Sequence, residues 1–204
     1  MITIKNTYTM KKSQLLSILS LALIIAFSFS SCSKDDPVPE IDQEEYDAAE
    51  LEFVSLETIN GELVETDESV VITFSPDGKS APSHSHLTEG ETYRLKVTLF
   101  HDGESINQEI LDAGDEHQFF FVGAPDGVFD YRYEDQNVGL TGVLTVTGHS
   151  DAAFDWNIVL RHGLNKNHAA AQEWDSTDYV QAGGADDVNV TAELHVTATG
   201  EHDH

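Results

Sequence analysis

Apolar residues alternate strictly with polar ones along residues 91–101, and this pattern constrains the fold more than any other feature of the chain. Tyr93, Leu95, Val97 and Leu99 fall on one side of the extended segment, whereas threonine, arginine and lysine fall on the other. A period of two predicts a β-strand with one buried face and one polar face. The same period recurs, in places more weakly, at 52–59, 69–75, 117–122, 129–134, 143–148, 155–162 and 188–198.

Gly, Asp, Asn and Pro separate these segments, and no long helical period interrupts them. Residues 106–112 are compatible with one short helical turn, and residues 163–187 predict a loop with a little helix around 169–174. Seven or eight short strands joined in this way predict an all-β fold, an antiparallel β-sandwich of immunoglobulin-like size. The large aromatic residues Phe119–Phe121 and Trp156 are expected to fill its core.

The start of the chain has the layout of a targeting segment. Lys11 and Lys12 precede an apolar run at 15–29, which is too short for a stable membrane span and ends in Ser30-Ser31-Cys32. This arrangement resembles a bacterial lipobox, in which Cys32 becomes the lipidated first residue; an uncleaved anchor is the alternative. We expect a signal peptide at 1–31, an acidic flexible tether at 32–51, a β-sandwich domain at 52–200 and a His-containing tail at 201–204.

The residues after Cys32 bear on localisation. Ser33-Lys34-Asp35-Asp36 resembles the surface-export signal of Bacteroidetes lipoproteins. The resemblance implies an outer-membrane lipoprotein on the cell surface, and an ordinary linker on the periplasmic face is the alternative. Two or three acyl chains would hold the protein stably at the membrane, which a single chain would not.

Charge and composition exclude several functions. Removal of residues 1–31, which carry three lysines and no acid, leaves seven basic and 37 acidic side chains, a formal charge of −30 with histidine neutral. Such a polyanion repels phosphate backbones, which argues against nucleic-acid binding, and it concentrates cations. Cys32 is the only cysteine, so thiolate chemistry is absent from the domain. We expect no enzyme, because no G-x-S-x-G, H-E-x-x-H or phosphate-loop motif occurs.

Several short stretches carry a resemblance to a known family. They are 114–121 (GDEHQFFF), Gly139-Leu140, 159–162 (VLRH) with Asn165-Lys166, and 182–184 (AGG) before the last strand. Together with the lipobox, they resemble small Bacteroidetes lipoproteins often labelled "type 1 periplasmic binding fold". That label implies a two-lobed α/β protein, for which this chain is too short and too rich in strands. The resemblance also implies a partner, a TonB-dependent outer-membrane receptor.

Ten histidines suggest metal chemistry, and His84-Ser85-His86 is the strongest local signal. Residues two apart in an extended segment project to one side, so both imidazoles can face one ion. The alternative is two solvated loop histidines. A second pair, His202 and His204, lies in the tail. Neutral imidazole suits zinc, with copper or nickel as alternatives, and such a site loses metal as pH falls below about 6.5.

Chain direction groups the histidines further. If each strand from 69 onward reverses, one end of the sandwich receives the metal site, and the other end receives a secondary cluster. The predicted metal ligands are His84, His86, His149, His202 and His204. The secondary cluster is His101, His117 and His162, which continue the core-facing parity of their strands, although each could simply bond a loop carbonyl. His195 lies on the polar face of its strand and is expected to be a solvated surface residue.

These expectations combine into a lipid-anchored binding module. It would capture a divalent transition metal, zinc first, and assist a TonB-dependent transporter. The alternative is a structural or adhesive immunoglobulin-like surface lipoprotein in which the histidines have no metal role.

Overall fold

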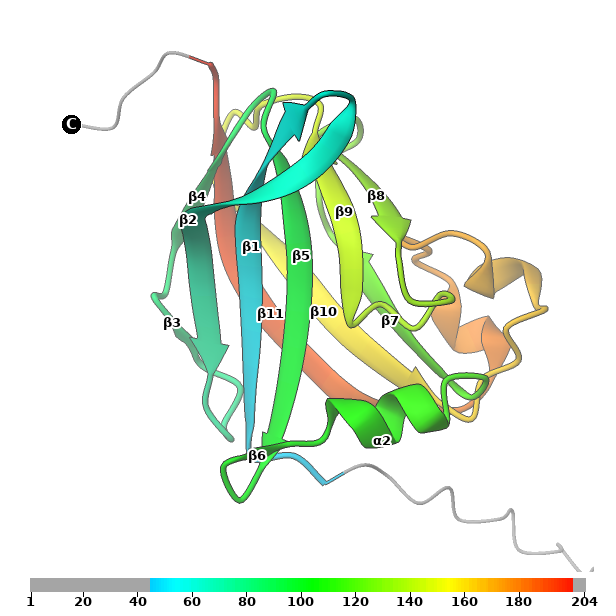
Figure 1. Ribbon diagram of the computed structural model, residues 1–204. Coiled ribbons are helices and arrows are strands. Elements are labelled where there is room, and N and C mark those ends of the chain that lie inside the picture. The colour runs from blue at the N-terminus through cyan, green and yellow to red at the C-terminus, as the bar shows by residue number, and fades with distance from the viewer. Residues whose placement is uncertain (1–44, 200–204) are drawn as a thin grey trace, which may run out of the picture. The chain divides into compact units, whose positions relative to one another are not determined.

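The computed structural model describes residues 45–199, and within this range the chain is nearly all β-structure. The predicted all-β sandwich is confirmed (Figure 1). Its eleven strands are β1 (Ala48–Ile59), β2 (Glu62–Phe74), β3 (Ser80–Ala81), β4 (Ser85–Thr88), β5 (Thr92–His101), β6 (Glu104–Ser105), β7 (His117–Val122), β8 (Phe129–Tyr133), β9 (Thr141–Val146), β10 (Phe154–His162) and β11 (Ala185–Thr197).

Two sheets form the layers of the sandwich. A seven-stranded sheet has the order β3-β2-β1-β5-β9-β8, with β6 paired to β5, and a four-stranded sheet has the order β4-β11-β10-β7. Neighbouring strands are antiparallel except β4 and β11, which are parallel. The parallel pair places β4 at the edge of the smaller sheet, where two of the predicted metal ligands, His84 and His86, are found.

The core lies between the sheets, as the alternation predicts. Leu95 and Leu99 of β5 are fully buried in one cluster with Phe53 of β1 and with Phe121 and Trp156 of the other sheet. The rings of Trp156 and Phe121 stack with centroids 5.2 Å apart. Period-two burial on both sheets therefore brings the two apolar faces together and fixes which side chains stay outside.

The structure extends the predicted strand list in two ways. Strand β1 begins at Ala48, inside the range 32–51 that the sequence assigned to a tether, because Ala49 and Leu51 continue the buried parity of Phe53. Three strands beyond the predicted eight, β3, β4 and β6, have only two to four residues. Segments this short show no period of their own and pair only because a long neighbour is already in place.

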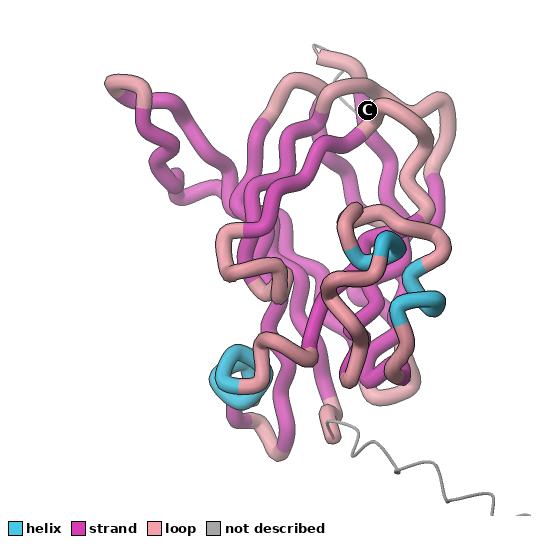
Figure 2. Tube along the Cα trace, turned by 90° about the vertical axis from the view of Figure 1, so that its right-hand side faces the viewer, coloured by secondary structure: helices cyan, strands magenta, loops and turns pink. Residues whose placement is uncertain are grey.

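Helical segments lie outside the two layers (Figure 2). Helix α2 (Asn107–Asp112), at the predicted helical turn, crosses one end of the sandwich in Figure 1 and buries Ile110. The predicted loop contains two 3-10 turns, η2 (Ala169–Ala171) and η3 (Tyr179–Ala182). It covers Phe120 on the outer face of β7 with Leu164, Ala171 and Ala182.

One arginine ties the end of this loop to the sheet. Arg161 of β10 donates hydrogen bonds to the carbonyl oxygens of Gly183 and Gly184 and pairs with Asp186 at 2.5 Å. Gly184 has a φ of 74°, and an added Cβ would collide with the carbonyl oxygen of His162. Glycine is therefore required for β11 to start this close to the end of β10.

The predicted signal peptide, Cys32 and the Ser33–Asp36 stretch lie outside the described residues. Among the helices of residues 45–199, none has both the length and the hydropathy that a membrane span requires.

Candidate metal centres

Two groups of side chains within residues 45–199 bring nitrogen or oxygen ligand atoms within 4.8 Å of one another. The exposed cluster consists of His84, His86 and His195. The buried cluster consists of His117, His162 and Asp187. Both lie on the four-stranded sheet, and each contains two histidines that the sequence predicts as cluster members and one residue that it does not.

The exposed cluster forms where the short strand β4 pairs with β11. His86 is the register partner of His195, and the flanking Ser85 and Leu87 point inward and are buried. Outward parity therefore places His84 and His86 on the solvent side, as the sequence predicted from their spacing. The ring centroids of His84 and His86 lie 4.5 Å apart, and those of His86 and His195 lie 5.4 Å apart.

A carboxylate orients the first of these rings. Glu193 Oε1 lies 2.7 Å from His84 Nδ1, so Nδ1 donates this hydrogen bond and leaves Nε2 to bind a ligand. Asp155 of β10 is the register partner of Glu193 and adds a second acid on the outer face. A histidine held by a carboxylate is the usual outer-shell arrangement of a metal ligand.

The other predicted ligands of this site are placed differently. His149 is exposed and lies 3.3 Å from Glu89 Oε2, and it is not among the three clustered residues. His202 and His204 lie outside the described residues. Among the described histidines, the third member of the exposed cluster is therefore His195, which the sequence had placed on the correct face but interpreted as a solvated residue.

The expectation that each predicted strand from residue 69 onward reverses direction is wrong at one connection, between β2 and β5. Strand β1 is antiparallel to both β2 and β5, so β2 and β5 run in the same direction. Residues 75–91 must therefore return along the sandwich, and β4 is part of that return. The histidines at 84 and 86 consequently sit along a sheet edge and not in a loop at the end where β2 arrives.

The buried cluster joins the ends of three neighbouring strands. His117 of β7 is the register partner of His162 of β10, and their rings stack with centroids 4.4 Å apart. Asp187 of β11 lies with Oδ2 3.6 Å from His117 Nε2 and 3.5 Å from His162 Nδ1. His101, the third residue of the predicted secondary cluster, ends β5 in the other sheet, is largely exposed and lies 3.8 Å from Asp102.

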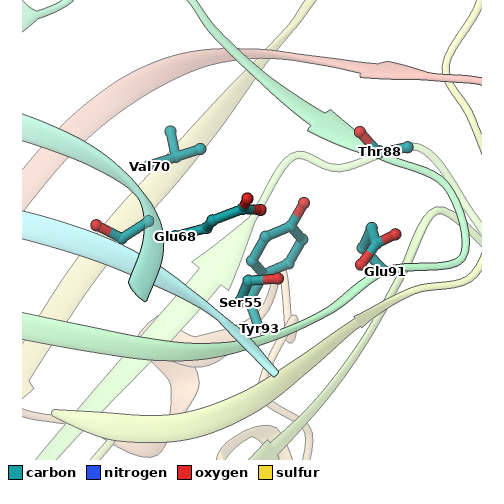
Figure 3. A pocket seen from close by; sticks show the side chains of 7 residues that line it. Ser55, Glu68, Val70, Thr88, Glu91 and Tyr93 are labelled. Carbon is teal, nitrogen blue, oxygen red and sulfur yellow. The ribbon is translucent and has the colours of Figure 1, made fainter. Parts of the chain in front are cut away.

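A separate polar pocket of about 340 Å³ opens beside the seven-stranded sheet (Figure 3). Glu68 and Glu91 flank the ring of Tyr93, with Ser55 and Thr88 nearby. Burial raises the pKa of the Tyr93 hydroxyl above its ordinary value. Small-molecule sites are mostly apolar in lining, which this pocket is not, and it contains none of the histidines.

Comparison with known proteins adds little to this picture. No family model and no curated protein matches the chain. A solved structure, "Crystal structure of the S-layer protein SbsC domains 4 and 5", is similar at 10% identity with a TM-score of 0.30, over 72% of this chain and 70% of that chain. A likeness this distant supports no inference about fold or function, so a functional proposal depends on the side-chain geometry alone.

Proposed function

We propose that this protein is a non-enzymatic binding module that captures a divalent transition metal, zinc first, at His84, His86 and His195. The observation that carries the proposal is the convergence of three imidazoles on one solvent-facing patch, from β11, from β4 and from the residue before β4. Imidazole nitrogen selects zinc, copper or nickel over calcium and magnesium, which prefer oxygen ligands.

The location of the site suits reversible capture. His86 is exposed and His84 and His195 are half-buried, so an ion can reach the patch without any rearrangement of the core. The cluster brings its ligand atoms within 4.8 Å, and ligands of one tetrahedral zinc ion lie about 3.4 Å apart. Side-chain rotations at this solvent-facing patch can close the gap. The strongly acidic chain, with a formal charge of −27, raises the cation concentration at its surface.

The cellular setting of this proposal comes from the sequence. A lipid on Cys32 would hold the module at the outer membrane, on the cell surface or on the periplasmic face, and a TonB-dependent receptor would be the partner that takes the metal. Metal delivery to a receptor requires a site that releases its ion, and a three-histidine surface site meets that requirement better than an enclosed one.

The test is a calorimetric titration of zinc into the purified protein at pH 7.5. Replacement of His84, His86 and His195 together by alanine is expected to remove one equivalent of bound zinc, because all three ligands of the patch are lost. The matched control is His149→Ala, which is expected to leave the number of equivalents unchanged. A triple variant that still binds as many zinc ions as the unmodified protein would refute the site.

A second variant tests the geometry more finely. Glu193→Gln keeps the shape of the side chain but removes the carboxylate that holds His84, and loss of such an outer-shell partner typically weakens metal binding by about 10-fold or more. Asp155→Asn also removes one negative charge from the same face but leaves the Glu193–His84 hydrogen bond in place, and a smaller change is expected. Equal effects of the two variants would mean that charge alone attracts the ion.

An interaction module is the second candidate, and one observation favours it. The hairpin formed by β1 and β2 exposes Ile59, Leu63 and Val64, each by 40% or more, and this gives it apolar surface that a partner could cover. Receptor recovery in a pull-down discriminates the two candidates. Equal recovery with and without a chelator favours the structural or adhesive module, whereas dependence on zinc favours capture.

A further inference from the structure

We infer that His117, His162 and Asp187 form a second metal site, a buried zinc site that ties together the ends of β7, β10 and β11. It is independent of the exposed cluster: its three residues lie on different strand segments, and its ligand atoms are enclosed. The proposal combines three observations, which are the burial of Asp187, the spacing of the ligand atoms and the partners of the two imidazoles.

The side chain of Asp187 is completely buried, as is that of His117. Among residues 45–199, no donor forms a hydrogen bond with either carboxylate oxygen of Asp187 or with Nδ1 of His162. A buried carboxylate without hydrogen bonds is strongly unfavourable and is found where a cation or a protonated partner compensates it. The cluster is thus a place where a positive charge is required.

The distances favour an ion over a direct ion pair. Charge-assisted hydrogen bonds between nitrogen and carboxylate oxygen are about 2.7–2.9 Å long. The two imidazole nitrogens lie 3.6 and 3.5 Å from Asp187 Oδ2. Zinc bonds of about 2.0–2.1 Å in tetrahedral geometry separate neighbouring ligand atoms by about 3.4 Å, which is close to the observed spacing.

Each imidazole also has a partner on its opposite nitrogen. His117 Nδ1 donates to the carbonyl oxygen of Ala113 at 3.0 Å, which leaves Nε2 directed at Asp187. His162 Nε2 lies 3.5 Å from Glu116 Oε2, which leaves Nδ1 directed at Asp187. Backbone carbonyls and carboxylates in these positions are what fixes the orientation of metal-bound histidines.

A β-bulge brings the carboxylate into the cluster. Leu160 pairs with Val188 but Arg161 pairs with Asp186, so Asp187 is the extra residue between two register pairs. Simple alternation from Val188 would turn Asp187 outward and Asp186 inward. The bulge reverses this, so that Asp186 meets Arg161 outside and Asp187 meets the histidines inside.

The surrounding chain holds the site rigid but leaves one route of entry. The turn between α2 and β7 is fixed by hydrogen bonds from Gly163 to the Glu116 carbonyl and from Lys166 to the Gly114 carbonyl. Of the three cluster residues, His162 alone has side-chain surface exposed, 13%, and the exposed Glu116 lies beside it. An ion would therefore enter past Glu116 and exchange slowly, as suits a structural role.

The experiment uses the full chain carrying the triple alanine replacement of the exposed cluster, so that zinc bound there cannot contribute. Elemental analysis after dialysis is expected to find one zinc per chain, and thermal unfolding is expected to shift upward by about 8 °C or more at a 1,000-fold excess of zinc over its Kd. Asp187→Asn in this background is expected to abolish both the bound zinc and the shift. His101→Ala, the control, is expected to change neither.

Measurements on the protein in excess chelator distinguish the metal site from a simple histidine–aspartate ion pair. Without metal, Asp187→Asn removes an uncompensated buried charge and is expected to leave the melting temperature unchanged or higher. If Asp187→Asn lowers the melting temperature in chelator, and the protein without this substitution binds no zinc, the proposal is overturned in favour of the ion pair. If Asp187→Asn does not fold, His162→Gln gives the same test by zinc content. Zinc retained by either folded variant overturns the site, whatever the exposed cluster binds.

Discussion

Replacement of Trp156 by alanine is expected to lower the free energy of unfolding by about 3–5 kcal/mol, the upper range for truncation of a buried aromatic side chain. Trp156 is fully buried, and its ring lies 6.0 Å from Phe53, 5.2 Å from Phe121 and 5.4 Å from Phe129. These rings come from both sheets, so the truncation leaves a cavity at the interface between the layers. The indole nitrogen has no hydrogen-bond partner among the described residues, so the loss comes from packing.

Urea denaturation followed by circular dichroism measures this loss. The matched control is Trp174→Ala, because Trp174 is only half-buried and contacts the core at its edge, with its ring 5.8 Å from Tyr131. A loss of about 1–2 kcal/mol is expected for the control, in proportion to its smaller buried area. Equal losses for the two tryptophans would contradict the placement of Trp156 at the centre of the core.

Local alternation was sufficient to predict the long strands. Tyr93, Leu95, Val97 and Leu99 are all buried, and each of the eight predicted segments overlaps an observed strand. The reason is physical: a strand with one buried face needs an apolar residue at every second position, and the local sequence shows this pattern directly. It holds wherever the strand is long enough to show two or three repeats.

The local sequence does not show which strands pair with each other. The differences between the predicted and the observed candidate sites follow from this. The outward parity of His195 was visible in the sequence, but its neighbour His86 depends on β4, a four-residue strand whose pairing joins residues more than 100 positions apart. His101 continues the parity of β5 and is nevertheless exposed, with its ring 3.8 Å from Asp102 and not in a shared cluster with His117 or His162. The face to which each side chain points was therefore predictable from the sequence, whereas its neighbours in space were not.

The β-bulge at Asp187 shows a second limit. A single inserted residue shifts the parity of everything before it on β11, and no period can reveal it in advance. The run Gly183-Gly184-Ala185-Asp186-Asp187 contained a signal, since glycine in or beside a strand often marks a bulge, but it did not indicate which acid turns inward. That assignment required the register of β10.

Alkaline pH is expected to destabilise the protein through two tyrosines of β8. Burial raises the pKa of the Tyr131 hydroxyl and of the Tyr133 hydroxyl far above the ordinary value of 10, because the charged phenolate would be buried. Each group favours folding fully below pH 10, where both states are protonated. As pH rises above 10, only the unfolded state loses the proton, so this stability is lost.

The linkage gives the size of the effect. Each tyrosine that stays protonated in the folded state costs about 1.4 kcal/mol per pH unit above 10, so the pair would lower the free energy of unfolding by about 5 kcal/mol between pH 10 and pH 12. Chemical denaturation at a series of pH values from 8 to 12 measures this slope. A slope no steeper than that of an exposed tyrosine would contradict the burial of both hydroxyls.

Two phenylalanine variants separate the contributions. Tyr131→Phe is expected to be neutral or stabilising at pH 7, because the hydroxyl has no hydrogen-bond partner among residues 45–199. Tyr133→Phe is expected to cost about 1 kcal/mol at pH 7, because the Tyr133 hydroxyl donates to the carbonyl oxygen of Phe119 at 2.6 Å. Each variant should recover about half of the alkaline loss, whereas the control Tyr46→Phe, at a less buried position, should recover less. Since β8 pairs with β9 in the larger sheet, this loss is expected to destabilise that sheet directly.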